Sequence, residues 1–313
     1  MNQSRAPDQI RLGYRQILPE GTFIPKENPA TVVSAYYEMP SKHPKDHYRK
    51  WIRFFLETVP CYLVFYTEEA LVPFINECRA KYADRTVVVV LQRSEWVANT
   101  RVQQKEWDAL FRIDPEKEMH ASPELYKVWY EKKEFVRRAI ELNPFGHTDF
   151  VWTDAGIIRN QELAQLVTAY PNANRIPTDR IMLLNVWPFV RHDEVVGEVN
   201  GISFVGGGVD RPRIGGGVIA ASTTLWTQFF TLYDETINRY RSAGLFWGKD
   251  QTLFKTMVLE NKQLFSLIEL KAIAPEMWFY SILYLGCSPK LFERLRSEKT
   301  NGTKMTYSQL LKI

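Results

Sequence analysis

Cysteine is scarce in this sequence, and the three that occur, Cys61, Cys78 and Cys287, lie far apart without the spacing of a metal site. Their scarcity favours a reduced compartment over a disulfide-stabilised secreted domain. No stretch approaches the roughly 20 consecutive apolar residues of a membrane-spanning helix. The first eight residues contain Pro7 and Asp8 and no apolar signal core. We therefore expect a soluble, cytoplasmic protein with no transmembrane segment.

A strong excess of one charge is also missing. Forty basic residues stand against 36 acidic ones, which gives a formal net charge of +4 dispersed along the chain. This balance predicts no nucleic acid partner, because such proteins concentrate basic residues in a patch or stripe. A locally positive cleft for a diphosphate remains compatible with it.

Several familiar catalytic and nucleotide motifs are absent. The sequence has no Gly-x-Ser-x-Gly elbow and no P-loop. His43 and His47 have helical spacing, but no third ligand accompanies them, so they predict surface positions rather than a zinc site. A Gly-x-Gly-x-x-Ala pattern at 215–220 matches a dinucleotide fingerprint only in part, since it lacks an early βαβ context and a ribose-binding acid. The absence of such a motif after Val33 counts against a Rossmann-type dehydrogenase, which is one rival interpretation.

What the sequence does contain is a large apolar fraction in a regular order. Hydrophobic residues make up 45% of the 313, enough for a sizeable core. Short apolar runs rich in β-branched residues alternate with helix-period segments. We expect strands at 31–37, 61–66, 86–91, 149–153 and 180–186, a hairpin at 194–204 with an Asn200-Gly201 turn, and helices at 70–82, 122–143, 223–241 and from 250 onward. Strands apolar on both faces predict an α/β fold with a mostly parallel central sheet flanked by helices.

The segment around Asp154 is the first candidate for chemistry. An apolar strand runs directly into Asp154, Ala155 and Gly156. In an open α/β sheet, ligands bind outside the carboxyl ends of the strands, so this carboxylate is expected at a cleft. A divalent cation that neutralises a diphosphate needs carboxylate oxygens of this kind. Aspartate and glycine also favour plain turns, and this segment alone does not separate the two interpretations.

Asp250 is the second candidate. It precedes a helix, so it is expected to act as the N-cap, and the same carboxylate is also able to face a cleft and accept a proton. Trp247 beside it is expected to offer a flat apolar surface for a sugar ring. The run Gly215 to Gly217 predicts close approach of backbone to a ligand, with a mobile surface loop as the alternative.

Three segments, in this order, carry a resemblance to a known family. They are Val32-Val33-Ser34-Ala35-Tyr36-Tyr37 with Lys50-Trp51, Leu125-Tyr126-Lys127-Val128-Trp129 through Trp152-Thr153-Asp154-Ala155-Gly156, and the glycine-rich run followed by Asp250-Gln251. In these segments the chain resembles the HtrL/YibB family of bacterial, algal and large-virus proteins, which are related to glycosyltransferases of the GT-A fold. The resemblance covers roughly Thr31 to Leu285.

The resemblance implies a GT-A-like nucleotide-sugar-binding fold with a small antiparallel hairpin. It implies a glycosyltransferase that moves a sugar from a nucleotide-diphosphate donor, UDP-linked in our expectation, to a glycan or other hydroxyl acceptor. We accordingly divide the chain into a leader at 1–30 that packs on the domain, a nucleotide-binding half at 31–160 and an acceptor half at 161–313 of a single domain.

Site residues follow from the same resemblance. Donor contacts are expected from Ser34, Ala35, Tyr36, Tyr37, Lys132, Trp152, Thr153, Asp154 and Arg159, acceptor or sugar contacts from Gly215, Gly216, Gly217, Trp247 and Gln251, and catalysis from Asp250. Tyr36 and Tyr37 are adjacent in a strand, so their side chains point to opposite faces. Only one of them is therefore expected to line the pocket.

The sequence departs from the family pattern at the metal motif. The usual motif is Asp-x-Asp, whereas Gly156 stands at the place of the second acid, and no histidine follows His192. A Mn²⁺ or Mg²⁺ ion on Asp154 is one expectation, with the diphosphate and water completing its shell. Neutralisation of the phosphates by Lys132 or Arg159 is the other. A carbohydrate-binding protein that keeps the fold without transfer is the remaining rival.

Overall fold

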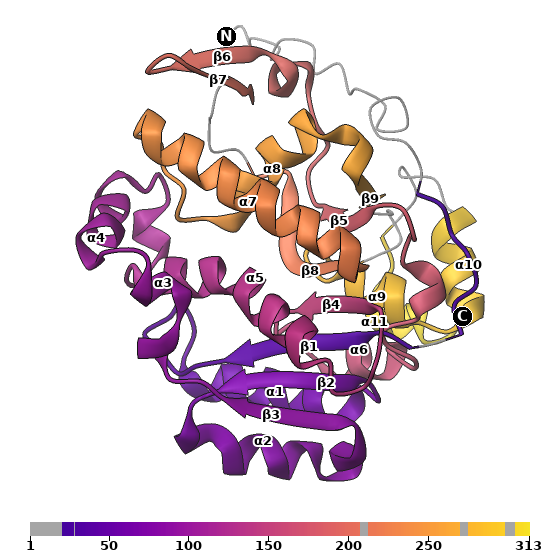
Figure 1. Ribbon diagram of the computed structural model, residues 1–313. Coiled ribbons are helices and arrows are strands. Elements are labelled where there is room, and N and C mark those ends of the chain that lie inside the picture. The colour runs from indigo at the N-terminus through magenta and orange to yellow at the C-terminus, as the bar shows by residue number, and fades with distance from the viewer. Residues whose placement is uncertain (1–20, 28, 207–211, 270–274, 298–303) are drawn as a thin grey trace, which may run out of the picture.

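The computed structural model describes residues 21–27, 29–206, 212–269, 275–297 and 304–313. Its centre is a seven-stranded sheet in the order β3-β2-β1-β4-β8-β5-β9 (Figure 1). The strands are β1 (Thr31–Tyr36), β2 (Tyr62–Thr67), β3 (Thr86–Val90), β4 (Asp149–Thr153), β5 (Ile181–Asn185), β8 (Ile214–Ser222) and β9 (Phe265–Glu269). Only β8 is antiparallel to its neighbours β4 and β5, whereas the other pairs are parallel. The predicted mostly parallel sheet is confirmed.

Alternation along the strands explains why helices cover both faces. Val32 and Val33 are adjacent and fully buried, but they belong to different hydrophobic clusters on opposite sides of the sheet. A strand buried on both sides must be apolar throughout, which is the pattern the sequence shows.

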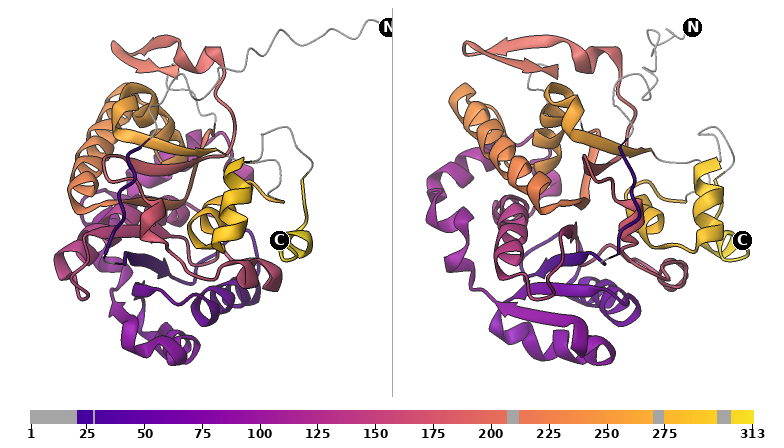
Figure 2. Two further views of the ribbon diagram at one scale, coloured as in Figure 1. Left: turned by 90° about the vertical axis from the view of Figure 1, so that its right-hand side faces the viewer. Right: turned by 45° about the vertical axis from the view of Figure 1, so that its right-hand side comes forward.

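Two helical layers supply those clusters. The helices are α1 (Lys45–Thr58), α2 (Val72–Arg79), α3 (Val97–Thr100), α4 (Gln104–Ile113), α5 (Glu124–Leu142), α6 (Gln161–Leu166), α7 (Thr223–Ala243), α8 (Asp250–Glu260), α9 (Tyr280–Gly286), α10 (Pro289–Ser297) and α11 (Tyr307–Leu310). Apolar residues of α5, α7 and α8 pack on one face. Those of α1, α2, α6, α9, α10 and α11 pack on the other. Figure 2 shows α7 in orange on one side of the sheet and the yellow C-terminal helices on the opposite side.

The predicted hairpin is formed by β6 (Val196–Val199) and β7 (Ile202–Val205). Asn200 and Gly201 both have positive φ, 51° and 77°, as a two-residue turn of this kind requires. The hairpin lies beside α7 and α8, far from β3 (Figure 1).

Local expectations differ from the structure at two places. The glycines Gly215 to Gly217 lie inside β8 and not in a loop, because both edges of that strand are paired. The helix expected at 122–143 begins slightly later: α5 starts at Glu124, and its N-cap Pro123 has no side-chain capping hydrogen bond.

The end of the predicted leader runs across the sheet. The Thr22 backbone donates to Asp179 Oδ1 at 2.6 Å, and Lys26 forms an ion pair with Asp149 at 2.6 Å. Residues 1–20 of that leader lie outside the described residues. Among the helices that the structure describes, none has the length and apolarity needed to cross a membrane.

Helix α5 is anchored by a buried acid next to Lys132. Both carboxylate oxygens of Glu131 accept backbone N–H groups at the start of α3, from Val97 and Ala98, each at 3.0 Å. The side chain is fully buried. Burial raises the pKa of Glu131 from 4.5 to about 7, against the opposing effect of the two N–H donors.

This raised pKa predicts a pH-dependent stability. A group whose pKa is higher in the folded than in the unfolded state contributes stability below pH 4.5 and loses it as the pH rises through 7. We expect the free energy of unfolding, measured by urea denaturation at pH 4.5 to 8, to fall by about 3 kcal/mol from this group. Glu131→Gln should remove that slope. An equally steep slope in the variant would assign the titration to other groups.

Candidate active site

The candidate site lies where the strand connections change direction. From β1 the chain proceeds outward through β2 to β3, and it returns to place β4 on the other side of β1. Ligands in open α/β sheets bind at such a point, outside the carboxyl ends of the strands. Asp154 directly follows β4, and its backbone N–H donates to Gly217 O at 2.8 Å. Because β8 runs in reverse, its first residues lie at the same edge as Asp154.

Asp154 is held by one carboxylate oxygen. Its Oδ1 accepts from Trp152 Nε1 at 2.8 Å and lies 3.1 Å from Lys132 Nζ. The Trp152 ring is buried and stacked on Phe135 of α5, with 6.0 Å between the ring centroids. This packing holds the Nε1 donor in a fixed position. The other oxygen, Oδ2, has no hydrogen-bond partner within the described ranges, and 43% of the side chain is exposed. Asp154 thus presents one carboxylate oxygen to solvent.

Lys132 joins the two acids that the sequence singles out. Its Nζ lies 3.1 Å from Asp154 Oδ1, 2.9 Å from Asp250 Oδ2 and 3.0 Å from Gly216 O. An ammonium group has three hydrogens, and these three acceptors use all of them. Only 7% of the side chain is exposed. Burial opposes the charge, but the two carboxylates outweigh it and raise the pKa of Lys132.

The same cluster acts on Asp154. The protein atoms packed around the bound side of the carboxylate desolvate it and raise its pKa, Lys132 opposes that rise, and the negative charge of Asp250 adds to it. Two carboxylates and one ammonium leave the cluster with a formal charge of −1. The site therefore combines a negative centre with a solvent-facing oxygen on Asp154.

Asp250 does not occupy the predicted cap position. The N-cap of α8 is Lys249, and Asp250 is the first helical residue, with Oδ1 accepting from Gln251 N at 2.8 Å. Its side chain is 3% exposed and is bound to Lys132. A Cβ added at Gly216 would lie 2.5 Å from Asp250 Oδ2. Gly216 thus permits close approach of this carboxylate to the backbone of β8.

Several predicted donor contacts are buried within the fold. Ser34 Oγ donates to Thr153 O at 2.6 Å, and the Thr153 hydroxyl lies 2.5 Å from the Tyr170 hydroxyl. Tyr37 is buried, donates to Leu91 O at 3.0 Å and packs edge-on against Trp96. These side chains have no open surface at the site.

Tyr36 differs from its neighbour. It is half-buried, as is Ala35 before it. Burial raises the pKa of the Tyr36 hydroxyl to about 12, with a further contribution from Glu38. Tyr36 therefore remains as the tyrosine able to line a pocket, while Tyr37 belongs to the core.

The expectation for Trp247 is wrong. Its side chain is buried, and its ring centroid lies 4.9 Å from that of Trp107. It therefore has no exposed face for a sugar ring. No local sequence pattern indicates this burial, because Trp107 is far from Trp247 in the chain. Gln251 is half-buried next to Asp250.

Arg159 lies between aromatic rings beside the Asp154 segment. Its guanidinium is 3.7 Å from the ring centroid of Trp51 and 5.2 Å from that of Phe279. A Cβ added at Gly156 would contact Trp51 and Tyr48 at 3.9 Å, so the segment after β4 packs on α1. Trp51 lies more than 100 residues before Arg159 in the chain, and no local sequence pattern indicates that it supports an arginine.

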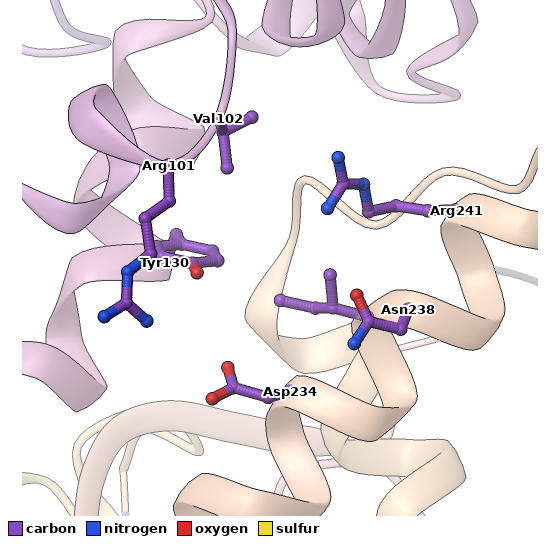
Figure 3. A pocket seen from close by; sticks show the side chains of 7 residues that line it. Arg101, Val102, Tyr130, Asp234, Asn238 and Arg241 are labelled. Carbon is purple, nitrogen blue, oxygen red and sulfur yellow. The ribbon is translucent and has the colours of Figure 1, made fainter.

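A separate cavity of about 230 Å³ lies between α5 and α7. Figure 3 shows Arg101, Val102 and Tyr130 on one side of it and Asp234, Asn238 and Arg241 on the other. Asp234 is paired with Lys133 at 2.9 Å. None of these residues belongs to the predicted site.

Most of the chain matches one protein family. A sequence profile of the family described as "Bacterial protein of unknown function (HtrL_YibB)" matches residues 30–280. Among proteins with curated functions, none is significantly similar.

Three solved structures are similar at low identity. They are mouse xyloside xylosyltransferase 1 in its apo form (12% identity, 83% of this chain and 95% of that chain, TM-score 0.39), the apo WbbM bifunctional glycosyltransferase (10%, 94% and 51%, 0.42), and a glycosyltransferase involved in glycosylation of the major capsid of PBCV-1 (11%, 83% and 92%, 0.35).

The ion cluster predicts a specific pattern of stability. Lys132→Met should leave the buried carboxylate of Asp250 without a counter-charge and destabilise the protein by about 3 kcal/mol. Adding Asp250→Asn should restore part of that loss, because the uncompensated charge is then removed. A double-mutant cycle by urea denaturation measures the coupling. Strictly additive effects would mean that the two side chains do not interact in solution.

Proposed function

The chain belongs to the HtrL_YibB family, and on this premise we propose that it is a glycosyltransferase that moves a sugar from a nucleotide-diphosphate donor to a hydroxyl acceptor. The observation that carries the proposal is the Asp154 carboxylate, held at the point where the strand connections change direction, with one oxygen open to solvent. Its Oδ1 has a structural role through Trp152 and Lys132, whereas Oδ2 makes no contact within the described residues that would add to stability. Its setting suits a charged ligand bound at the ends of β1 and β4.

The roles follow from position. In this proposal the nucleotide binds at the end of β1, and the partly exposed surfaces of Ala35 and Tyr36 support that position. The bond between the sugar's anomeric carbon and the diphosphate oxygen breaks, and the electron pair leaves with the nucleoside diphosphate. The acceptor oxygen forms the new bond and gives up its proton. Asp250 is the predicted proton acceptor, although its carboxylate is covered and bound to Lys132.

A divalent cation was expected on Asp154. The donor set does not fit a resident cation: one oxygen of Asp154 and one of Asp250 are already bridged by an ammonium. In the part of the chain that the structure describes, no three His, Cys, Asp or Glu side chains converge. The proposed reaction therefore uses no resident metal. Binding of a divalent cation together with the donor's diphosphate stays a prediction.

A nucleotide-sugar-binding protein without transferase activity is the second candidate. Gly156 at the place of the second acid and the covered position of Asp250 favour it. Thermal-shift measurements with a panel of nucleotide sugars, together with a donor-hydrolysis assay, separate the two. Binding without turnover for every donor would support the binding protein.

Asp154→Asn tests the proposed transferase directly. The amide oxygen can still accept from Trp152 and Lys132, so the melting temperature should change little. Loss of the negative charge at the reacting centre should slow transfer by about a hundredfold or more. Asp149→Asn, at the opposite end of the same strand and paired with Lys26, is the matched control and should transfer normally. Near-wild-type turnover of Asp154→Asn would assign this residue to a turn.

Asp250→Asn tests the predicted proton acceptor. Because Lys249 is the N-cap, the start of α8 should be preserved. If Asp250 takes the acceptor's proton, the transfer rate should fall by about a hundredfold while donor affinity is little changed. Rate, donor affinity and melting temperature are measured on one preparation. An unchanged rate would leave Asp250 as the partner that holds Lys132.

A further inference from the structure

The guanidinium of Arg159 is enclosed but has no acceptor. Within the described residues no hydrogen bond or ion pair reaches it, and its Nε is buried without a partner. A guanidinium carries five N–H donors: the one on Nε is buried and unpaired, which is costly, while those on the terminal nitrogens reach solvent and are available to a ligand. Aromatic stacking alone does not satisfy them, since hydrogen-bond donors lie in the plane of the group.

Three other arginines, Arg85, Arg93 and Arg138, also have a buried Nε without a partner, but each donates to an oxygen through a terminal nitrogen. Two further enclosed arginines have several acceptors. Arg79 donates to Thr86 and to the carbonyls of Leu56, Val59 and Cys61. Arg175 also stacks on a ring, that of Phe292 at 3.8 Å, yet it donates to the carbonyls of Tyr284 and Cys287. Within the described residues, Arg159 thus differs from these arginines in that none of its nitrogens has a protein acceptor.

The position of Arg159 connects it to the proposed donor site. It follows Asp154 in the segment between β4 and α6, and that segment packs against Tyr48 and Trp51 of α1. Burial lowers the pKa of Arg159, against the opposing effects of Tyr48, Asp154 and Glu276. A bound anion would supply the missing acceptors and favour the charged guanidinium.

Lys132, the other basic candidate at this edge, is already saturated. Its three hydrogens are directed at Asp154, Asp250 and Gly216. Binding a phosphate would require it to abandon one of these buried partners. The two cations therefore have different roles: Lys132 neutralises the protein's own acids, while Arg159 has its donors available.

We propose that Arg159, held over the ring of Trp51, binds the diphosphate of the donor and stabilises it as the leaving group. The inference rests on the proposed function and names the group that binds that site's phosphates. As the bond from the anomeric carbon to the diphosphate oxygen breaks, negative charge grows on the terminal phosphate. Arg159 meets that charge with N–H donors, and no proton is transferred to or from it.

Binding measurements without metal test the proposal. Inorganic pyrophosphate and uridine diphosphate are titrated in EDTA by calorimetry, with uridine as the phosphate-free reference. Wild-type protein should bind both phosphate compounds, and Arg159→Gln should bind them about 10- to 100-fold more weakly, the cost of losing charge-assisted hydrogen bonds. Uridine binding should be equal in the two proteins. Arg159→Lys should recover part of the affinity.

Two further variants control for charge and for placement. Arg53→Gln removes an exposed arginine from α1, where it is paired with Glu57 and Glu77, and should bind as wild type does. Trp51→Leu leaves Arg159 in place without its platform and should weaken pyrophosphate binding while melting temperature reports any loss of fold.

The outcomes separate this inference from the proposed function. Equal phosphate affinities of wild type and Arg159→Gln would overturn it, as would wild-type binding that appears only after Mn²⁺ is added. Failure to bind pyrophosphate under either condition would also overturn it. If Arg159→Gln turned over the donor and bound pyrophosphate as tightly as wild type does, the transferase proposal would be retained and the proposed role of Arg159 would be rejected. Arg159-dependent pyrophosphate binding with no turnover of any donor would support the phosphate site and count against the transferase.

Discussion

The ammonium of Lys132 joins side chains from parts of the chain that are remote in sequence. It projects from α5 and meets Asp154 after β4 and Asp250 at the start of α8, while also bonding the backbone of β8. Without this ammonium, two carboxylates and a carbonyl oxygen would lie close together with no positive charge between them. Breaking such a buried cluster leaves an uncompensated charge, which is why geometry at the strand ends depends on it.

The consequences of this cluster differ for the two acids. Asp250 is enclosed, and the absence of a side chain at Gly216 lets its carboxylate approach the sheet. Asp154 is pinned through one oxygen by Trp152 and Lys132 and exposes the other. A rigid carboxylate facing solvent is a feature of binding and catalytic sites, because pre-organised groups lose little entropy when a ligand arrives. The same constraint leaves Arg159 as the basic group at this edge whose donors remain available within the described residues.

Some local features of the fold and of the site are predicted correctly by the sequence, and others are not. Asn200 and Gly201 predicted a hairpin correctly because a two-residue turn with positive φ needs those residue types. Asp154 was identified because an acid directly after an apolar strand lies at a strand's carboxyl end. Trp247 was assigned an open face and Asp250 a cap, and both were wrong, because burial by Trp107 and pairing with Lys132 involve residues remote in the chain.

The sequence by itself determined the strand and helix pattern, the two-sided burial of the sheet and the candidacy of Asp154, since these depend on local periodicity and residue type. Only the tertiary structure decided that β8 runs antiparallel to its neighbours. In this arrangement Gly216 lies next to Asp250 and Gly217 next to Asp154. The tertiary structure alone placed Lys132 against Asp250, 118 residues away, and Arg159 over Trp51. Contacts of this kind follow from how the layers pack, and no local pattern specifies which distant side chains meet.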